Sequence, residues 1–190
     1  GRGCSWPCRR WSGRWRAKTR LQEMVSVQTT RLDDVAELDA VDLLKIDIQG
    51  GECDVFRNAV GKLKHCVAVY SEAAFVPLYS GQPLIDEQMR LLSPMGFLIH
   101  KFVSPKQIML SNRSTLLLLP RGNRNQLVDG DVIFVKNLLS LQEQPVEQLK
   151  HLAILADSVF SSYDLCLHVL DILRHAGNLD SASIDRYVDL

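Results

Sequence analysis

The 190-residue sequence lacks features that mark several classes of protein. It has no apolar run of 18 residues and therefore predicts no transmembrane helix. Its five cysteines are an odd number without the spacing of a disulfide framework or of a zinc site, so we expect no metal centre built on them. The cysteine pattern favours a reducing compartment, and we expect the protein to be cytoplasmic.

Acidic residues are almost missing from residues 1–24, a basic head with seven Lys/Arg and one acid, Glu23. The remaining residues hold 15 basic and 21 acidic side chains. A mildly acidic folded body argues against a nucleic-acid partner. All three tryptophans and two cysteines, Cys4 and Cys8, also lie in the head. This composition favours a disordered or non-native segment over a surface that contacts nucleic acid or a membrane.

Apolar runs alternate with amphipathic segments over residues 25–137, as in an α/β sheet with helices on its faces. We expect strands at 25–32, 41–48, 66–71, 97–102 and 132–135, and helices at 33–38, 52–63 and 84–92. Residues 115–119 are apolar enough for one more strand. The strand at 132–135 should pair with 97–102 as an antiparallel edge of a mostly parallel sheet.

Residues 138–190 predict a helical tail. Pro145 suits the start of a helix whose apolar positions form one stripe, a second helix spans 163–176, and a third begins near Ser181. This tail either covers the sheet or mediates a homodimer.

The most informative segment is VDLLKIDIQGGE, residues 41–52. Near-continuous apolar character predicts a strand buried on both faces, and Gly50-Gly51 then leads into a helix. Asp47 lies at the carboxyl end of this strand, where α/β sheets bind ligands. Glu72 ends the next strand, so the two carboxylates should meet at one edge of the sheet. Two carboxylates there can share a proton, bind an amine or hold a metal ion, whereas a cap or a loop salt bridge with Lys45 is the structural alternative.

Residues 41–52 resemble the strand signature of FkbM-type S-adenosylmethionine-dependent methyltransferases, which reads roughly K-I-D-x-E/Q-G-x-E. The resemblance continues through VAVYSEAAFVPLY (67–79) and SGQPLIDEQMRLLSPMGF (80–97), and it includes Thr30-Arg31-Leu32-Asp33-Asp34 upstream. It covers residues 28–136. The resemblance implies a Rossmann-like methyltransferase sheet and O-methylation of a sugar or another small hydroxylated metabolite.

The resemblance also implies roles for individual residues. Asp47 and Glu72 are the catalytic candidates, and Asp47, Gln49 and Gly50 are candidates for binding the cofactor, S-adenosylmethionine. Gln49 stands where a glutamate is frequent. Glu52, in the first turn of the following helix, suits a structural role because the helix dipole favours an acid there.

A strand, a glycine-rich loop and a helix should precede this signature, and nothing before Gln28 supplies them. We therefore expect a truncated methyltransferase that is itself inactive. The alternative is a non-catalytic binding or assembly module on the same fold. A glycosyltransferase-like domain would need a D-x-D metal motif; Asp129-Gly130-Asp131 has that form, but it resembles a turn ahead of a strand.

Aromatic and histidine side chains offer weaker candidates. Tyr70, Phe75 and Tyr79 either line an acceptor pocket or belong to the core, and core is the commoner case. His100 either faces the cleft or is a satisfied structural histidine. The cysteines at 53, 66 and 166 fit small core positions.

Overall fold

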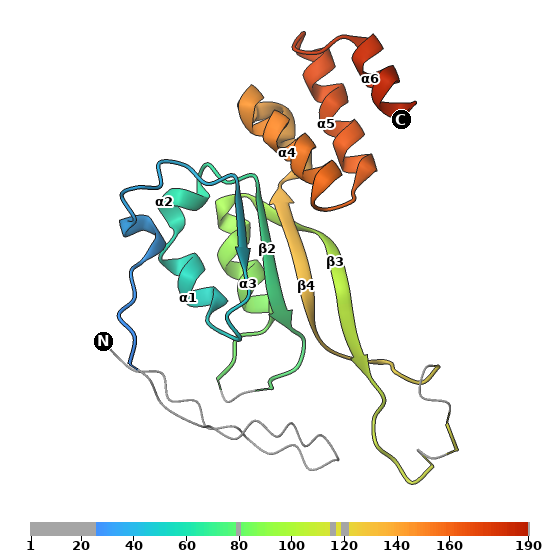
Figure 1. Cartoon of the computed structure of the whole chain (residues 1–190). Coiled ribbons are helices and arrows are strands. Elements are labelled where there is room, and N and C mark those ends of the chain that lie inside the picture. The colour runs from blue at the N-terminus through green and yellow to red at the C-terminus, as the bar shows by residue number, and fades with distance from the viewer. Residues whose placement is uncertain (1–25, 79–80, 115–116, 119–121, 190) are drawn as a thin grey trace.

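The computed structural model describes residues 26–78, 81–114, 117–118 and 122–189. The basic head and Tyr79 lie outside these residues. The described chain forms one four-stranded sheet, helices packed on it and a helical tail (Figure 1). Its elements are η1 (Leu32–Asp34), β1 (Leu43–Ile46), α1 (Glu52–Arg57), α2 (Val60–Leu63), β2 (Ala68–Ala74), α3 (Ile85–Leu92), η2 (Ser93–Met95), β3 (Phe97–Ile108), β4 (Gln126–Lys136), η4 (Leu138–Glu143), α4 (Val146–Ser158), α5 (Tyr163–His175) and α6 (Ser181–Val188).

The strand order in the sheet is β1-β2-β4-β3. β1 and β2 are parallel, and β4 is antiparallel to both β2 and β3. Three strands therefore run one way and β4 runs the other (Figure 1). The predicted pairing of 132–135 with 97–102 is confirmed, and so is the antiparallel sense of the pair.

The expectation of an antiparallel edge on a mostly parallel sheet needs a correction. β4 lies between β2 and β3, so two of the three strand pairings are antiparallel, and β3, not β4, is the edge strand on that side of the sheet. The interior position of β4 fits the burial of Val132–Val135, whose four side chains are all buried. A strand that is apolar on both sides suits the interior of a sheet better than its edge.

Helices cover both faces of the sheet, and alternate residues of each strand face opposite layers. On one face Val69, Val132 and Phe134 pack with Phe56, Leu63 and Leu92 of α1, α2 and α3. On the other face Ala68, Ile133 and Val135 pack with residues of α4 and α5, among them Leu149, Leu152 and Val169. The tail thus covers the sheet, whereas a homodimer through it stays a prediction.

Two predicted elements near the start of the described chain are wrong. Residues 26–31 form no strand, and η1 is a single 3-10 turn in place of a helix over 33–38. Val27 is 72% exposed, so the segment lacks the burial that stabilises a strand. The two leucines of 115–119 that the structure describes, Leu117 and Leu118, also lie outside strands.

The helix predicted over 52–63 is broken into α1 and α2 at Asn58 and Ala59. The Asn58 amide donates to the carbonyl of Asp54 at 2.8 Å, a side-chain bond that competes with helix continuation. Asp33 then caps α2: its two carboxylate oxygens accept the backbone amides of Gly61 (3.0 Å) and Lys62 (2.9 Å). The start of α2 is therefore stabilised by a side chain that lies 28 positions before Gly61 in the sequence.

The three cysteines outside the head, Cys53, Cys66 and Cys166, are buried free thiols, as predicted. Burial raises the pKa of the Cys66 thiol to about 11, which keeps it protonated and unreactive. No helix in the described part of the chain is long and apolar enough to cross a membrane.

Candidate active site at the carboxyl ends of β1 and β2

The turn after β1 is held by its own side chains. β1 ends at Ile46, so Asp47 lies in the turn that leads to α1. Gln49 and Gly50 both have positive φ values, 57° and 108°, and the second is a conformation that side chains rarely adopt. Glu52, 4% exposed, accepts the amides of Ile48 (2.9 Å) and Gly50 (3.0 Å). Glu52 therefore has the structural role that the sequence favoured.

Asp47 and Glu72 come together as predicted. β1 and β2 are adjacent and parallel, and the Gln49 side-chain amide donates to Asp47 Oδ1 at 2.9 Å and to Glu72 Oε2 at 2.7 Å. One amide nitrogen thus bridges the two carboxylates. This arrangement holds two like charges next to each other at the end of the sheet, and Gln49 partly compensates their repulsion.

The environment of Glu72 raises the pKa of its carboxyl from 4.5 to about 7. Burial is the largest cause, the neighbouring Asp47 carboxylate is the next, and the hydrogen bond from Gln49 acts in the opposite direction. A carboxyl with a pKa near neutrality is suited to accept a proton from a substrate and to release it again.

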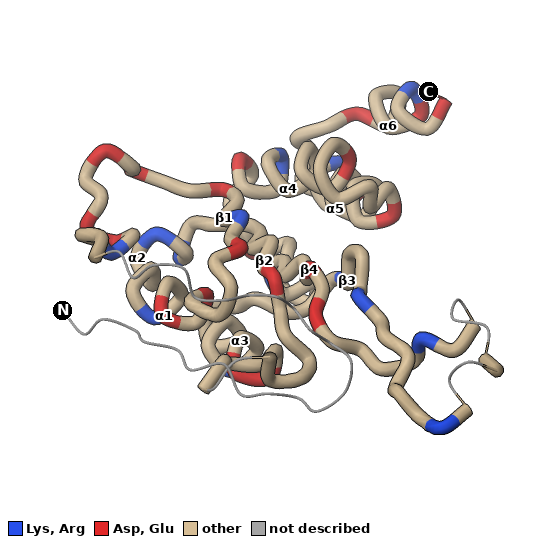
Figure 2. Tube along the Cα trace, turned by 60° about the horizontal axis from the view of Figure 1, so that its bottom comes forward, with Lys and Arg blue, Asp and Glu red and all other residues tan. Residues whose placement is uncertain are grey.

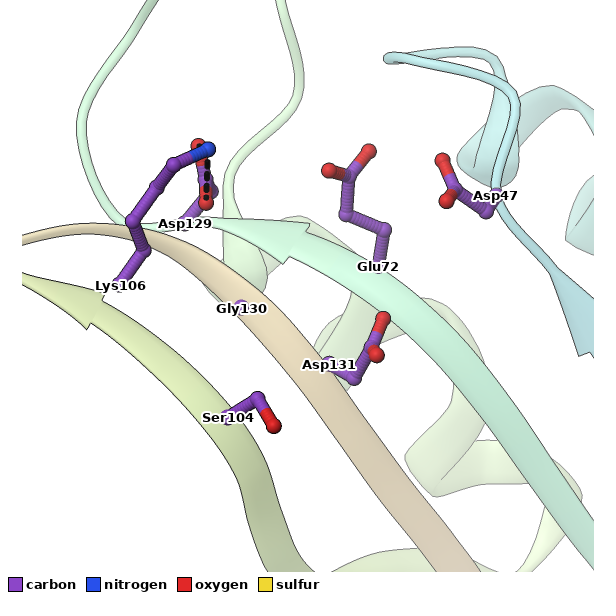
Figure 3. Close-up of a pocket in the computed structure, with 7 residues that line it drawn as sticks. All are labelled: Asp47, Glu72, Ser104, Lys106, Asp129, Gly130 and Asp131. Atoms are coloured by element: carbon purple, nitrogen blue, oxygen red, sulfur yellow. Dashed lines mark hydrogen bonds and ion pairs between the residues drawn. The ribbon is translucent and has the colours of Figure 1, made fainter.

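A cavity of about 280 Å³ opens beside this pair (Figure 3). Its remaining lining residues come from β3 and β4: Ser104, Lys106, Asp129, Gly130 and Asp131. Glu72 is paired in register with Asp131 and Asp129 with Ala74 across the antiparallel strands. Because side chains alternate along a strand, Glu72, Asp129 and Asp131 share the sheet face that carries Ala68, Ile133 and Val135. The cavity therefore continues the face that the tail helices cover elsewhere.

The reading of Asp129-Gly130-Asp131 as a turn is wrong, because all three residues lie inside β4. Gly130 is needed there for close approach of the neighbouring strand. A Cβ at this position would lie 2.9 Å from the Cα of Pro105, in a region where the β3–β4 register shifts. The irregular β3 segment thereby brings Ser104 and Lys106 to the cavity.

Acidic residues lie along neighbouring parts of β2 and β4 and close to the end of β1 (Figure 2). Four of the cavity's lining residues are acids, and Lys106 is its cation. Lys106 lies 3.2 Å from the Asp129 carboxylate and neutralises part of that charge. The cavity is consequently anionic and rich in hydrogen-bond acceptors, and it favours ligands that carry hydroxyl groups or positive charge.

Three carboxylates at this end of the sheet, two of them from the cavity, also have the spacing of a metal site. Oxygen atoms of Asp47, Glu52 and Glu72 lie within 4.8 Å of one another. Both oxygens of Glu52 already accept backbone amides, so Asp47 and Glu72 are the two that can turn toward a ligand.

The aromatic candidates take mixed positions. Tyr70 does not line the cavity. The Lys45 ammonium lies 3.9 Å from the Tyr70 ring centre, and the Tyr70 hydroxyl donates to Asp131 at 3.4 Å. The predicted alternative of a Lys45–Glu72 salt bridge is therefore replaced by a cation–π contact. Phe75 packs edge-on against Phe102, with ring centres 5.5 Å apart, and lines no part of the cavity.

His100 and Lys101 attach the tail to the edge strand. The His100 ring shares a 2.8 Å hydrogen bond with Ser162, a buried residue, and burial lowers the pKa of this histidine. Lys101 donates to the main-chain carbonyls of Phe160 and Ser161. The structural alternative for His100 is thus the one that the contacts support.

Comparison with known proteins gives a match to one family. Residues 9–99 match the model of the methyltransferase FkbM domain. The matched part is just under half of the 190-residue chain. The matched FkbM segment ends early in β3, so it contains Asp47, Gln49, Gly50 and Glu72 but not the cavity residues of β4.

A curated relative of the FkbM segment is the 2-O-methyltransferase NoeI of Sinorhizobium fredii (strain NBRC 101917 / NGR234). The two sequences are 38% identical over 66 residues, which is 33% of this chain and 27% of the relative. The match thus spans about a quarter of the length of that relative. No solved structure matches the chain.

Proposed function

We propose that this FkbM-type domain serves an S-adenosylmethionine-dependent O-methyltransferase whose acceptor is a sugar or another small hydroxylated metabolite. The observation that carries the proposal is the Asp47–Glu72 pair, bridged by Gln49 at the mouth of an anionic cavity. The relative NoeI, named as a 2-O-methyltransferase, supports transfer to oxygen. A cytoplasmic location is part of this proposal.

The residues present fit a cationic cofactor. Bound S-adenosylmethionine supplies a methyl group on a positively charged sulfur. Asp47, next to the positive-φ turn at Gln49 and Gly50, offers a carboxylate for that charge or for the ammonium group of the cofactor. Lys106, the cation of the cavity, is paired with Asp129 and so does not oppose it.

Glu72 takes the role of proton acceptor. Methylation of a hydroxyl group releases a proton, and a carboxylate within hydrogen-bonding reach of that hydroxyl can receive it. The raised pKa of Glu72, about 7, matches the task near neutral pH. Gln49 holds the Glu72 side chain beside Asp47 at the cavity, and Asp131 extends the row of acceptors that orients further hydroxyls of a sugar.

The negative charge of the cavity restricts the kinds of acceptor molecule that it can bind. Carboxylates accept hydrogen bonds from hydroxyl groups, whereas they repel phosphate and carboxylate groups. We therefore propose a neutral or positively charged acceptor. A phosphorylated sugar would meet four acids and one already paired lysine.

Non-catalytic binding is the second candidate, and one observation favours it: the sequence before β1 contains no glycine-rich loop between a strand and a helix. On this ground we propose that the isolated chain binds S-adenosylmethionine weakly. Calorimetric titration measures it, and a dissociation constant in the low micromolar range would contradict this part of the proposal.

Transfer of a labelled methyl group to neutral sugars tests catalysis, in this chain and in any longer natural form of the protein. Asp47→Asn should lower turnover roughly 10²–10⁴-fold, the usual contribution of a positioned acid–base or charge-handling group. It should change the free energy of unfolding by only about 1–2 kcal/mol, because asparagine can still accept the Gln49 bond.

Asp86→Asn is the matched control, since Asp86 is an exposed acid of α3 that pairs with Arg90 away from the cavity. It should leave turnover unchanged. Activity of Asp47→Asn within a few-fold of the parent, with a large loss of stability, would make Asp47 a structural cap. Absence of transfer in every form of the parent protein would favour the binding module.

A further inference from the structure

At Glu72, strand β2 is paired with a neighbouring strand on one side only. The last register pair between β1 and β2 joins Ile46 to Ser71, so Glu72 is one residue beyond it. On its other side β4 continues, with Asp131 opposite Glu72. The main chain of Glu72 therefore needs a support that β1 does not provide.

Gln88 of α3 provides that support. Its side-chain amide nitrogen donates to the main-chain carbonyl of Glu72 at 2.8 Å, across 16 residues of sequence. The Ser71 hydroxyl donates to the same oxygen at 3.0 Å. Gln88 is 2% exposed, which is rare for a glutamine. Burial removes most of its rotamers, so the amide is held in one place relative to the sheet.

The position of Gln88 has a cost that packing does not explain. Its Oε1 atom is buried and has no hydrogen-bond partner among the described residues. An apolar side chain of similar size would avoid this cost, because a buried acceptor without a partner is destabilising. What the glutamine gains in return is the bond to Glu72.

The helix that carries Gln88 is itself firmly placed. Leu92, one turn further along α3 and fully buried, packs in the core under the sheet. Residues four apart lie on the same face of a helix, so the face that anchors α3 also presents Gln88 to β2. Movement of the Glu72 main chain is therefore coupled to a rigid element.

We propose that Gln88 is a positioning residue that holds the end of β2 so that the Glu72 carboxylate stays beside Asp47 and faces the cavity. This rests on the proposed function for its catalytic meaning. Gln88 need not contact substrate. It acts through the main chain of Glu72, whose side chain depends on the direction in which that main chain leaves the sheet. Displacements of about 1 Å in such groups reduce turnover by as much as 10²-fold.

The test is the titration of Glu72 itself, followed by carbon-13 NMR of the side-chain carboxyl in the full 190-residue chain. In the parent the midpoint should lie at about 7, set by burial and by the charges of Asp47 and Asp129. Gln88→Met keeps the volume and removes the donor. It should lower the midpoint by about one unit or more, because a loosened Glu72 gains water and moves away from Asp47.

Leu92→Val is the matched control, since it disturbs the same buried face of α3 without touching Glu72. It should lower stability and leave the Glu72 midpoint unchanged. Gln88→Asn is the second variant: its amide is one methylene shorter and cannot reach the carbonyl, so its midpoint should shift in the direction of Gln88→Met. This variant answers the question if Gln88→Met fails to fold.

An unchanged Glu72 midpoint in a folded Gln88 variant would overturn the proposed role, and so would an equal shift in Leu92→Val. In a form of the protein that transfers methyl groups, Gln88→Met should lower kcat about tenfold or more with little change in KM. Absence of methyl transfer in every form of the parent protein would instead overturn the proposed function. The Glu72 titration does not require activity, so it distinguishes the two failures.

Discussion

At the scale of single residues, the raised pKa of Glu72 has a consequence for stability that does not depend on catalysis. Between pH 4.5 and about 7 the folded protein keeps a proton on Glu72 that the unfolded chain has released. Stability therefore falls as the pH rises through this range, since the folded state must then carry a partly buried charge next to Asp47.

Replacing Glu72 with glutamine removes this loss. We expect Glu72→Gln to have a higher melting temperature than the parent at pH 8, with the difference disappearing near pH 4.5, where both side chains are neutral. Thermal unfolding across this pH range measures it. If Glu72→Gln were less stable than the parent at pH 8, by as much as at pH 4.5 or by more, the Glu72 carboxylate would be stabilising in the folded state.

The residues around Glu72 show which parts of the site the sequence predicts and which it does not. Asp47 and Glu72 are predictable because each follows an apolar strand, and parallel strands bring their carboxyl ends to one edge. The sequence Asp129-Gly130-Asp131 predicts a turn instead of a strand, since two acids and a glycine are typical of turns. Only the pairing of β4 with β2 turns them toward Glu72. Gln88 gives no local sign, because its role depends on a contact across 16 residues.

At the scale of elements, the short helix α2 depends on Asp33. Its carboxylate accepts the amides of Gly61 and Lys62, and these bonds lower the pKa of Asp33 below its usual range. Asp33→Ala should reduce the free energy of unfolding by about 1 kcal/mol, a typical cost for the loss of a helix cap. Because an acid with a lowered pKa stabilises only when ionised, the difference should shrink as the pH falls below about 3.8.

Asp34→Ala is the matched control for this cap. Asp34 neighbours Asp33 in η1, and its exposed carboxylate pairs with Arg31 at 2.6 Å. Surface pairs of this kind contribute little, about 0–1 kcal/mol. Chemical denaturation of the two variants compares them, and an equal loss in both would mean that Asp33 acts through general charge and not through the α2 amides.

The local hydrophobic pattern predicts most of the strands and helices. The elements whose bounds it does not predict share a cause. The apolar spacing over 52–63 indicates a helical face correctly, but the break at Asn58 depends on a side-chain bond and on the distant Asp33. Likewise, β3 and β4 extend well beyond 97–102 and 132–135 into polar residues, since pairing with each other stabilises backbone that their side chains do not predict. Long-range pairing decides these boundaries.

At the scale of the whole molecule, the tail and the sheet share one core. Leu152 of α4, 1% exposed, belongs to the buried cluster that includes Ala68 of β2 and Ile133 of β4. A further link joins His151 to Asp42 at 2.7 Å, just before β1. The sequence predicts a boundary between the sheet and the helical tail at residue 138. A shared core instead predicts that the two parts unfold together.

Leu152→Ala should therefore destabilise β2 as much as α4. Removal of a fully buried leucine costs about 2–5 kcal/mol, whereas Ile154→Ala on the same helix, at a residue 62% exposed, should cost less than about 0.5 kcal/mol. Hydrogen exchange measured by mass spectrometry reads each element separately. We expect amides of β2 and α4 to lose protection by similar factors in Leu152→Ala and to keep it in Ile154→Ala. Faster exchange confined to α4 and α5, with β2 protected as in the parent, would mean that the tail is a separate unit; the sheet and its carboxylate cavity would then be stable without it.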